Sequence, residues 1–274
     1  MSGFDLAAYL ARIGLRAPAA DAAGLAQVQL AHRLAIPFEN LDIWLGRGIA
    51  IDSDAVFAKL VTARRGGWCF EHNRLFLDAL AALGFAASPI LARVWLGVTD
   101  TPPLTHTFAR VRLDGGDWIA DTGFGASYVP PMPLVDGAEA MAPDGARFRL
   151  GRGDAGDWML LRDGDAATTD GRGEGAGFQP QYTFTGDPAC AADLAMGNHW
   201  CATAPGGRLV SHRIVSIVLP CGFAALTDRA YRCKADGIQT AEAIADPQAY
   251  RARLRIPFGI DLREDEATRV FAAA

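Results

Sequence analysis

The sequence lacks the features that would direct this chain to nucleic acid or into a membrane. Its net charge is −5 over 274 residues, so no overall basic surface for nucleic acid is expected. No run reaches the roughly 18 apolar residues of a membrane span, and the uncharged stretch 79–92 is broken by Gly84 and Pro89. The N-terminus has neither the basic segment nor the apolar core of a signal peptide. We therefore expect a cytoplasmic protein without a nucleic-acid or membrane partner.

Cysteines are few, and their spacing argues against several chemistries. There are five, an odd number spread widely, which is not typical of a disulfide framework and agrees with reduced thiols in a cytoplasm. There is no C-x-x-C pair and no phosphate-binding glycine loop of the P-loop or dinucleotide type. We predict no metal site. The minor alternative is zinc held by residues without ligand-like spacing, namely Cys201, Cys221, Cys233, His199 and His212.

The residue pattern divides the chain into three regions, 1–88, 89–189 and 190–274. In the first, apolar residues at helical spacing predict helices. In the second, β-branched and aromatic runs between short turns predict an antiparallel sheet or barrel. The third is predicted to mix helix and strand, so the fold class is α+β. The expected helices are 4–13, 22–36, 69–83, 193–200, 240–244 and 247–254. The expected strands are 90–98, 105–113, 118–121, 147–150, 158–162, 178–184 and 214–219. Residues 163–177 are expected to form a mobile loop.

The segment 64–73 carries the strongest chemical signal. Cys69 follows Gly66 and Gly67, at the predicted first turn of the helix 69–83. Glycines permit a sharp bend and let backbone N–H groups approach a substrate. A helix N-terminus favours negative charge and so lowers the pKa of a thiol. We therefore predict that Cys69 is a nucleophile, whereas the other four cysteines are expected to be small structural side chains.

Two histidines compete for the role of general base. His72 lies one helical turn from Cys69, and His106 lies in a predicted strand between two threonines. We favour His106, although composition alone leaves the choice open. Asp121, at the end of the next strand, is either a turn residue or the group that orients His106. A regular hairpin turning at 114–116 leaves Asp121 roughly 10–13 Å along the strand from His106, so a bulge, a bend or a strand switch is expected.

Five short segments, in this order and spacing, form a specific pattern. They are Tyr9-Leu10-Ala11-Arg12-Ile13-Gly14, Ile36-Pro37-Phe38-Glu39-Asn40-Leu41-Asp42, Arg65-Gly66-Gly67-Trp68-Cys69, Thr105-His106 and Asp121-Thr122-Gly123-Phe124-Gly125. With them the chain resembles the arylamine N-acetyltransferases over nearly its whole length. The resemblance implies an N-terminal helical bundle, an antiparallel β-barrel and a C-terminal α/β lid around a papain-like core. It places the catalytic roles on Cys69, His106 and Asp121, and so selects His106 over His72 by analogy.

The resemblance also implies the substrates. Acetyl-CoA would donate an acetyl group to Cys69, and an aromatic amine or hydrazine would accept it, with no permanently bound cofactor. N-hydroxyarylamines are expected as possible acceptors on oxygen. Phe38, Trp68 and Phe124 are expected to build an apolar acceptor pocket, unless they are plain core. Leu209 stands where relatives usually carry a phenylalanine that lines the pocket, which affects acceptor preference.

The CoA contacts are assigned to Gly125, Arg208 and Arg213. Between residues 206 and 234 basic side chains outnumber acidic ones, and the interpretation that we favour for them is a solvated face. Glu39 and Arg65 are expected to form a buried ion pair that braces the turn before Cys69.

Three other functions share parts of the pattern. A macrolactam-forming amide synthase of the same fold would differ in pocket size, set partly by Leu209 and the 163–177 loop. A cysteine hydrolase of the protease or transglutaminase type uses the same three residue types. A non-catalytic binding module is hard to reconcile with a complete Cys–His–Asp set.

Overall fold

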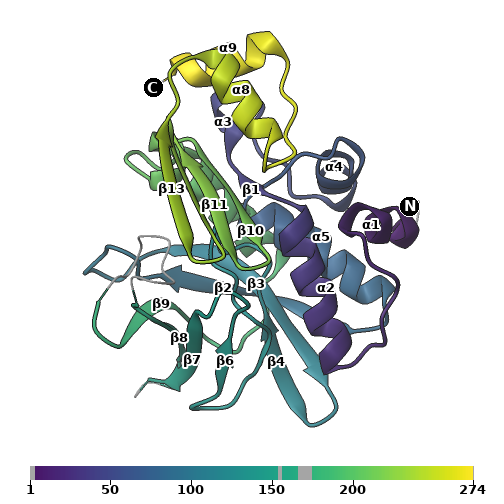
Figure 1. The fold of residues 1–274 in the computed structure, drawn as a ribbon. Helices are drawn as coiled ribbons and strands as arrows, with labels where there is room; N and C mark the ends of the chain where they lie inside the picture. Colours follow the sequence, from purple (N-terminus) through teal and green to yellow (C-terminus); the bar gives the residue numbers. More distant parts are fainter. Residues whose placement is uncertain (1–3, 154–155, 166–174, 274) are drawn as a thin grey trace.

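The N-terminal helices cover one face of the central β-structure in the computed structural model, which describes residues 4–153, 156–165 and 175–273 (Figure 1). Helix α1 (Leu6–Ile13) begins at Asp5, whose carboxylate accepts the N–H of Ala8, and ends at the left-handed Gly14. Helix α2 (Ala22–Ala35) is capped in the same way by Asp21. These helices and α5 (Cys69–Ala82) were predicted from the sequence, and their apolar faces share a core with Ala109, Val111 and Ala120 of the sheet.

Eight antiparallel strands form the near-closed barrel of the second region. Their order is β5-β4-β3-β2-β9-β8-β7-β6. The interior is filled by aromatic and aliphatic side chains such as Phe108, Phe148 and Tyr182. The strands are β2 (Ala86–Val94), β3 (Leu104–Leu113), β4 (Gly116–Ala120), β5 (Met132–Pro133), β6 (Glu139–Met141), β7 (Arg147–Arg152), β8 (Trp158–Asp163) and β9 (Phe178–Phe184). Residues 166–174 of the predicted loop 163–177 lie outside the described residues.

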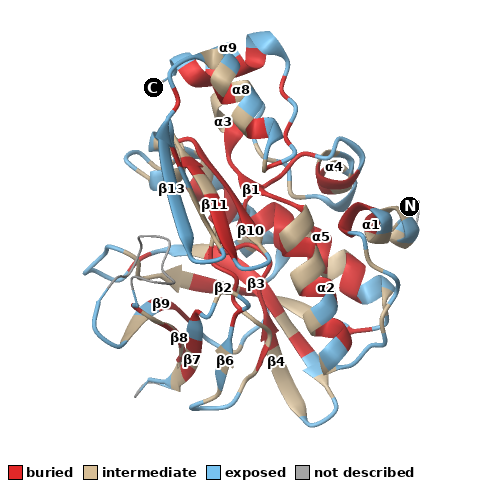
Figure 2. Cartoon of the chain, in the orientation of Figure 1, coloured by how far each residue is buried: buried red, intermediate tan, exposed pale blue. Residues whose placement is uncertain are grey.

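The C-terminal part is a second antiparallel sheet with helices packed on it. Its order is β1-β10-β11-β12-β13, with β1 (Phe38–Glu39), β10 (Ile214–Leu219), β11 (Gly222–Thr227), β12 (Ala230–Ala235) and β13 (Ile238–Ala243). The prediction of a helical turn at 240–244 is wrong, since these residues fall largely in β13. Strand β13 is a fully exposed edge (Figure 2), and pairing with β12 overrides the helical preference of Ala and Glu there.

The first and third regions interlock. Strand β1 (Phe38–Glu39) pairs with β10, although it comes from the N-terminal part of the sequence. Helix α3 (Leu41–Trp44) follows it, and Leu41 and Leu45 join the core beneath the C-terminal sheet. The division at residues 88 and 189 therefore remains a proposal about sequence regions. The remaining helices are α4 (Ser53–Phe57), the π-helix η1 (Ala58–Thr62), α6 (Ala191–Thr203), α7 (Arg208–Ser211), α8 (Pro247–Arg255) and α9 (Glu264–Ala272).

The described ranges contain neither a membrane-spanning helix nor a cluster of metal ligands. Within residues 4–153, 156–165 and 175–273, no helix has the length and apolar character needed to cross a bilayer. In the same part of the chain, no group of three or more His, Cys, Asp or Glu side chains is arranged to hold a metal ion.

Candidate active site

Cys69 begins helix α5, and two glycines set the chain that leads to it. Gly67 pairs with Phe38, and its carbonyl accepts the N–H of Glu39 at 2.8 Å. A Cβ atom on Gly66 would lie 2.2 Å from the carbonyl oxygen of Pro37, and one on Gly67 would lie 2.7 Å from Glu71. The glycines therefore permit close packing rather than the sharp bend expected from the sequence. The left-handed residue of this segment is Arg64, with φ 52°.

Cys69, His106 and Asp121 meet in the buried space between α5 and the barrel. Nε2 of His106 lies 2.7 Å from Oδ2 of Asp121, and the Cys69 thiol interacts with the same imidazole. All three residues are at least 95 % buried. Because Nε2 is occupied by Asp121, Nδ1 is the nitrogen left for the thiol.

The β3–β4 hairpin brings Asp121 to His106 without a strand switch. The turn is one residue tighter than expected, because Leu113 pairs with Gly116 and Ala109 with Ala120. Asp121, the residue after β4, therefore lies opposite Phe108 rather than opposite residue 109 or 110. His106 is two residues from Phe108 along β3 and on the same face of the sheet. It is therefore a diagonal neighbour of Asp121, within side-chain reach. The predicted need for a bulge, a bend or a switch between these two strands is wrong.

The three groups affect one another's pKa values. Burial favours the neutral imidazole of His106, but the charge of Asp121 and the hydrogen bond to it outweigh burial and raise the pKa to about 10. Burial also favours the neutral carboxyl of Asp121, yet His106 lowers its pKa below the usual range. Burial raises the pKa of the Cys69 thiol, and His106 opposes that rise. The thiol therefore depends on His106 for its ionisation more than on its position at a helix end.

Asn73 joins the nucleophile helix to the strands that carry the other two groups. Its Nδ2 donates to the carbonyl of Thr107 at 2.6 Å and to that of Cys69 at 3.1 Å, and its Oδ1 accepts the hydroxyl of Thr122 at 3.1 Å. Gly123 permits this approach, since a Cβ there would lie 2.5 Å from Cα of Cys69. The sequence analysis missed Asn73; its position one turn after Cys69 was the available signal.

Further contacts fix the Asp121 carboxylate and the loop that follows it. Oδ1 of Asp121 accepts the N–H of Gly123 at 2.8 Å, and Oδ2 accepts the hydroxyl of Tyr182 at 3.1 Å. From α2, Gln29 accepts the N–H of Asp121 at 2.9 Å, and Arg33 donates to the carbonyls of Thr122 and Gly125. Gln29, Arg33 and Tyr182 were not predicted as partners, because they lie far from this segment in the sequence.

His72, the competing base, belongs to a different network. Its Nδ1 lies 2.9 Å from Nε2 of His32, and its Nε2 donates to the carbonyl of Pro37 at 3.0 Å. His32 in turn contacts the hydroxyl of Tyr9 at 3.0 Å. Burial lowers the pKa of His72 to about 3. A neutral imidazole with both nitrogens engaged is not placed to deprotonate Cys69.

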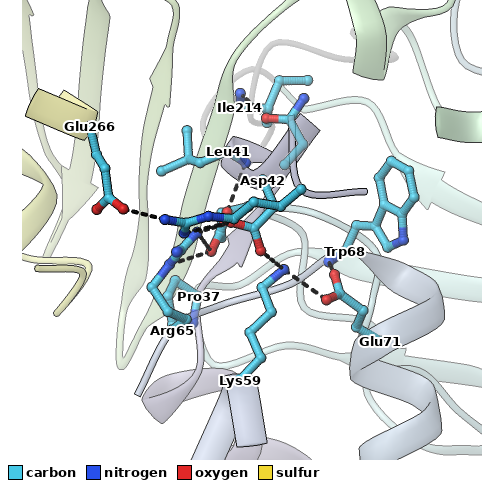
Figure 3. A network of polar contacts seen from close by, with 12 residues as sticks. Pro37, Leu41, Asp42, Lys59, Arg65, Trp68, Glu71, Ile214 and Glu266 are labelled. Carbon is cyan, nitrogen blue, oxygen red and sulfur yellow. Dashed lines mark hydrogen bonds and ion pairs between the residues drawn. The ribbon is translucent and has the colours of Figure 1, made fainter. Parts of the chain in front are cut away.

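A buried network of charges supports the turn before Cys69 (Figure 3). Arg65 donates to Glu39 at 2.6 Å and to Asp42 at 3.1 Å, so the predicted Glu39–Arg65 pair is confirmed. Lys59 lies 2.9 Å from Asp42 and 2.7 Å from Glu71. Glu71 accepts the N–H of Trp68 at 3.0 Å, which anchors the residue before the cysteine.

The network reaches the C-terminal helix. Arg47 contacts both Asp42, at 3.4 Å, and Glu266 of α9. Burial raises the pKa of Glu71 to about 7 even though Lys59 is its partner.

The four residues predicted to line the acceptor pocket lie close to Cys69, His106 and Asp121, in two clusters. Phe38 and Trp68 pack with Cys69, and Leu209 of α7 lies against the same cluster. Phe124 lies on the barrel side, with its ring centroid 5.1 Å from that of His106. Trp68 is fully buried and donates to Asn198 of α6 at 2.9 Å, which is the behaviour of a core residue.

Asn40 fixes the backbone of the segment that carries Leu209. Its Nδ2 donates to the carbonyls of Leu209 and His212, both at 2.7 Å. Its Oδ1 accepts the N–H of Ile214, also at 2.7 Å. The Asn40 side chain thus fixes one wall beside Cys69.

The three residues assigned to CoA are not equivalent. Arg208 is exposed on α7, and Gly125 is half-buried with its φ at 59°. Arg213 is 2 % exposed and is held by Asp228 at 2.9 Å and by the carbonyl of Val270, also at 2.9 Å. The predicted contact between Arg213 and CoA is therefore not favoured, because its guanidinium is already bound inside the protein.

A groove of about 730 Å³ runs beside the site, between β2, β9 and α6. Its lining includes Trp95, Met196 and Trp200. The lining also includes Leu104 and Gly197, which lie next to residues that surround Cys69. Cys69 itself does not line the groove.

Comparisons with known proteins agree with this arrangement. An N-acetyltransferase family model matches residues 21–267. Arylamine N-acetyltransferase of Mycolicibacterium smegmatis is 36% identical over 221 residues, which cover 78% of this chain and 76% of the relative. A relative from Salmonella typhimurium, named arylamine N-acetyltransferase / N-hydroxyarylamine O-acetyltransferase, is 35% identical over 222 residues, which cover 79% of this chain and 74% of the relative. Proansamycin X synthase of Amycolatopsis mediterranei is 32% identical over 194 residues, covering 69% of this chain and 70% of the relative.

Solved structures match over almost the whole chain. Arylamine N-acetyltransferase from Salmonella typhimurium superposes with a TM-score of 0.90 at 30% identity, covering 99% of this chain and 100% of the other. The Mycobacterium marinum enzyme in complex with CoA has a TM-score of 0.87 at 28% identity, covering 98% and 99%. The chain belongs to the arylamine N-acetyltransferase family.

Proposed function

We propose that this chain is an arylamine N-acetyltransferase that carries acetyl groups on Cys69, with acetyl-CoA as donor. The observation on which the proposal rests is the imidazole of His106 placed between the thiol and the carboxylate of Asp121. This arrangement can move a proton from sulfur to nitrogen and back within one buried site. The Mycobacterium marinum relative in complex with CoA supports the choice of donor.

In the first half-reaction, the Cys69 sulfur attacks the thioester carbonyl of acetyl-CoA as a thiolate, whose proton His106 already holds. Asp121 keeps the imidazole in one tautomer and stabilises its charged form. The negative oxygen of the intermediate would be met by backbone N–H groups of the first turn of α5, which have no partner within the helix. His106 then returns the proton to the leaving CoA thiol.

In the second half-reaction, an aromatic amine attacks the acetyl-cysteine. The amine is neutral near pH 7, so it suits an apolar surface such as that offered by Phe38, Phe124 and Leu209. His106 accepts the amine proton, and Cys69 leaves as the thiolate. Oxygen of an N-hydroxyarylamine can take the place of nitrogen, as the name of the Salmonella relative suggests.

CoA is assigned to Gly125 and Arg208, without Arg213. The five free thiols suit the reducing cytoplasm assumed for this chemistry.

The test is mass spectrometry of the reduced protein after acetyl-CoA is added without an acceptor. We expect one added acetyl group on Cys69, which an aromatic amine then removes. Cys69→Ser should carry no acetyl group and lose turnover, because a hydroxyl is far less ionised than a thiol at neutral pH. Cys221→Ser, at an exposed site, is the matched control and should behave like wild type. Turnover by Cys69→Ser would exclude the covalent route.

A second function, amide formation on a larger substrate, is favoured by one observation. Proansamycin X synthase belongs among the relatives, and Leu209 leaves more room than a phenylalanine would. Arylamine acetylation is preferred because the Mycolicibacterium smegmatis relative with that name has higher identity, 36% against 32%, over more of the chain. Steady release of CoA without any amine would instead indicate a hydrolase.

A further inference from the structure

A second thiol lies beside Cys69. Cys201, on α6, is 8 % exposed, and its Sγ lies 3.4 Å from the carbonyl oxygen of Thr105. Sγ of Cys69 lies 3.7 Å from the same oxygen. The two sulfurs therefore have one acceptor in common, and the acetyl-transfer chemistry uses only one of them.

The packing of α6 explains why the thiols are close. Gly197 is one turn before Cys201, and a Cβ atom there would lie 2.8 Å from the ring of Phe70 and 3.0 Å from the carbonyl oxygen of Leu104. Asn198, on the same helix, accepts the indole N–H of Trp68 at 2.9 Å. Helix α6 thus contacts both chain neighbours of Cys69, and a glycine permits this approach.

The two thiols differ in chemistry. Burial raises the pKa of Cys201 to about 12, and among the described residues no charged group lowers it. Cys69 has His106 as a proton acceptor. An oxidant that reaches the site therefore reacts at Cys69 first, and Cys201 remains a thiol.

We propose that Cys201 is a resolving cysteine: when a peroxide oxidises Cys69, Cys201 closes a disulfide with it and makes the oxidation reversible. This inference depends on the proposed function only in needing Cys69 to be the reactive thiol. The side chains of Cys69 and Cys201 have to rotate about their Cα–Cβ bonds. This rotation moves the two sulfurs away from the Thr105 carbonyl and brings them to about 2.05 Å from each other.

The chemistry balances with hydrogen peroxide as the two-electron oxidant. The Cys69 thiolate attacks one peroxide oxygen and the O–O bond breaks, which gives a sulfenic acid and a hydroxide that takes a proton from His106 to become water. The Cys201 sulfur then attacks the Cys69 sulfur. The S–S bond forms, the S–O bond breaks, and the hydroxide leaves with the Cys201 proton as water. Two equivalents of an external thiol restore both cysteines.

The experiment uses the full, reduced chain treated with a molar excess of hydrogen peroxide, so that a sulfenic acid left unresolved at Cys69 meets a second equivalent of oxidant. Free thiols are then blocked, and a digest is searched for the peptide containing residue 69 linked to the peptide containing residue 201. Acetyl transfer is measured before oxidation, after oxidation and after dithiothreitol, each relative to the untreated sample of the same variant. Cys201→Ala is compared with Cys233→Ala, a half-buried cysteine of the C-terminal sheet.

Wild type and Cys233→Ala should form the 69–201 link and recover most of their activity. Cys201→Ala should accumulate the sulfinic acid and recover about fivefold less, since that oxidation state is not reduced by thiols. Absence of the link, or equal recovery in all three proteins, overturns the inference. Acetylation of Cys69 by acetyl-CoA is measured on the same samples, so its presence without the link would leave the proposed function intact.

Discussion

At the residue scale, proton transfer in the site depends on how Asp121 sets the imidazole. We expect Asp121→Asn to lower kcat by on the order of 10³–10⁴, because the amide loses the charge that holds His106 in its tautomer. The pKa of His106 should fall, so alkylation of Cys69 by iodoacetamide near neutral pH should slow as well. Asp117→Asn, in the same hairpin but outside the site, should change neither rate. Unchanged alkylation in Asp121→Asn would contradict this electrostatic role.

The His106–Asp121 pair also makes stability depend on pH. The folded-state pKa of His106 is about 10, above the usual 6.5 of imidazole. Its stabilising contribution is therefore complete below about pH 6.5 and is lost as pH rises through about 10. Melting temperatures of wild type and His106→Gln, measured from about pH 6 to about pH 10, should converge as pH rises. A difference that stays constant across that range would count against the pair as its source.

Gly123 provides a test of close packing by a single methyl group. Gly123→Ala would place a Cβ atom 2.5 Å from Cα of Cys69 and 2.7 Å from Asn73. We expect a loss of about 1–3 kcal/mol in the free energy of unfolding, together with lower activity. Gly151→Ala is the control, because its Cβ would meet nothing closer than 3.7 Å. Denaturant unfolding of both variants measures the difference.

At the element scale, local signals predicted the helices better than they predicted the contacts between elements. The caps at Asp21 and Gly14 act within a few residues, so the sequence reveals them. The predicted pairing of β3 with β4 was shifted by one residue, because the turn between them could close at either Gly115 or Gly116. Strand β13 was taken for a helix, since only pairing with β12 makes it a strand. Gln29, Arg33 and Asn73 were missed because their partners are 34 to 100 residues away.

The charge network before α5 supports a stability prediction at this scale. Arg65→Ala leaves the fully buried Glu39 without its cation, so we expect a loss of about 3–5 kcal/mol. Arg147→Ala removes one partner of the exposed Glu139 pair and should leave the melting temperature nearly unchanged, because solvent screens an exposed ion pair. Thermal unfolding of the two variants compares them. Equal melting temperatures would show that the network does not stabilise the turn.

At the scale of the whole molecule, the three sequence regions depend on one another. Strand β1 completes the C-terminal sheet, and Leu41 and Leu45 fill its core. We therefore expect the fragment 190–274 to lack a cooperative fold when expressed alone, whereas the full chain unfolds in a single transition. Circular dichroism during heating measures both. A cooperative transition in the fragment would show that the C-terminal part is an independent domain.

The contacts of Asn40 have a consequence for how enzymes of this design diversify. One amide holds the backbone at residues 209, 212 and 214, next to the nucleophile, so the path of the chain there is set independently of which side chain occupies position 209. In the proposed acceptor pocket, we expect a change of residue at position 209 to alter the shape offered to the acceptor while the scaffold stays in place. We therefore expect new acceptor ranges to arise by single exchanges at Leu209, with little penalty in folding.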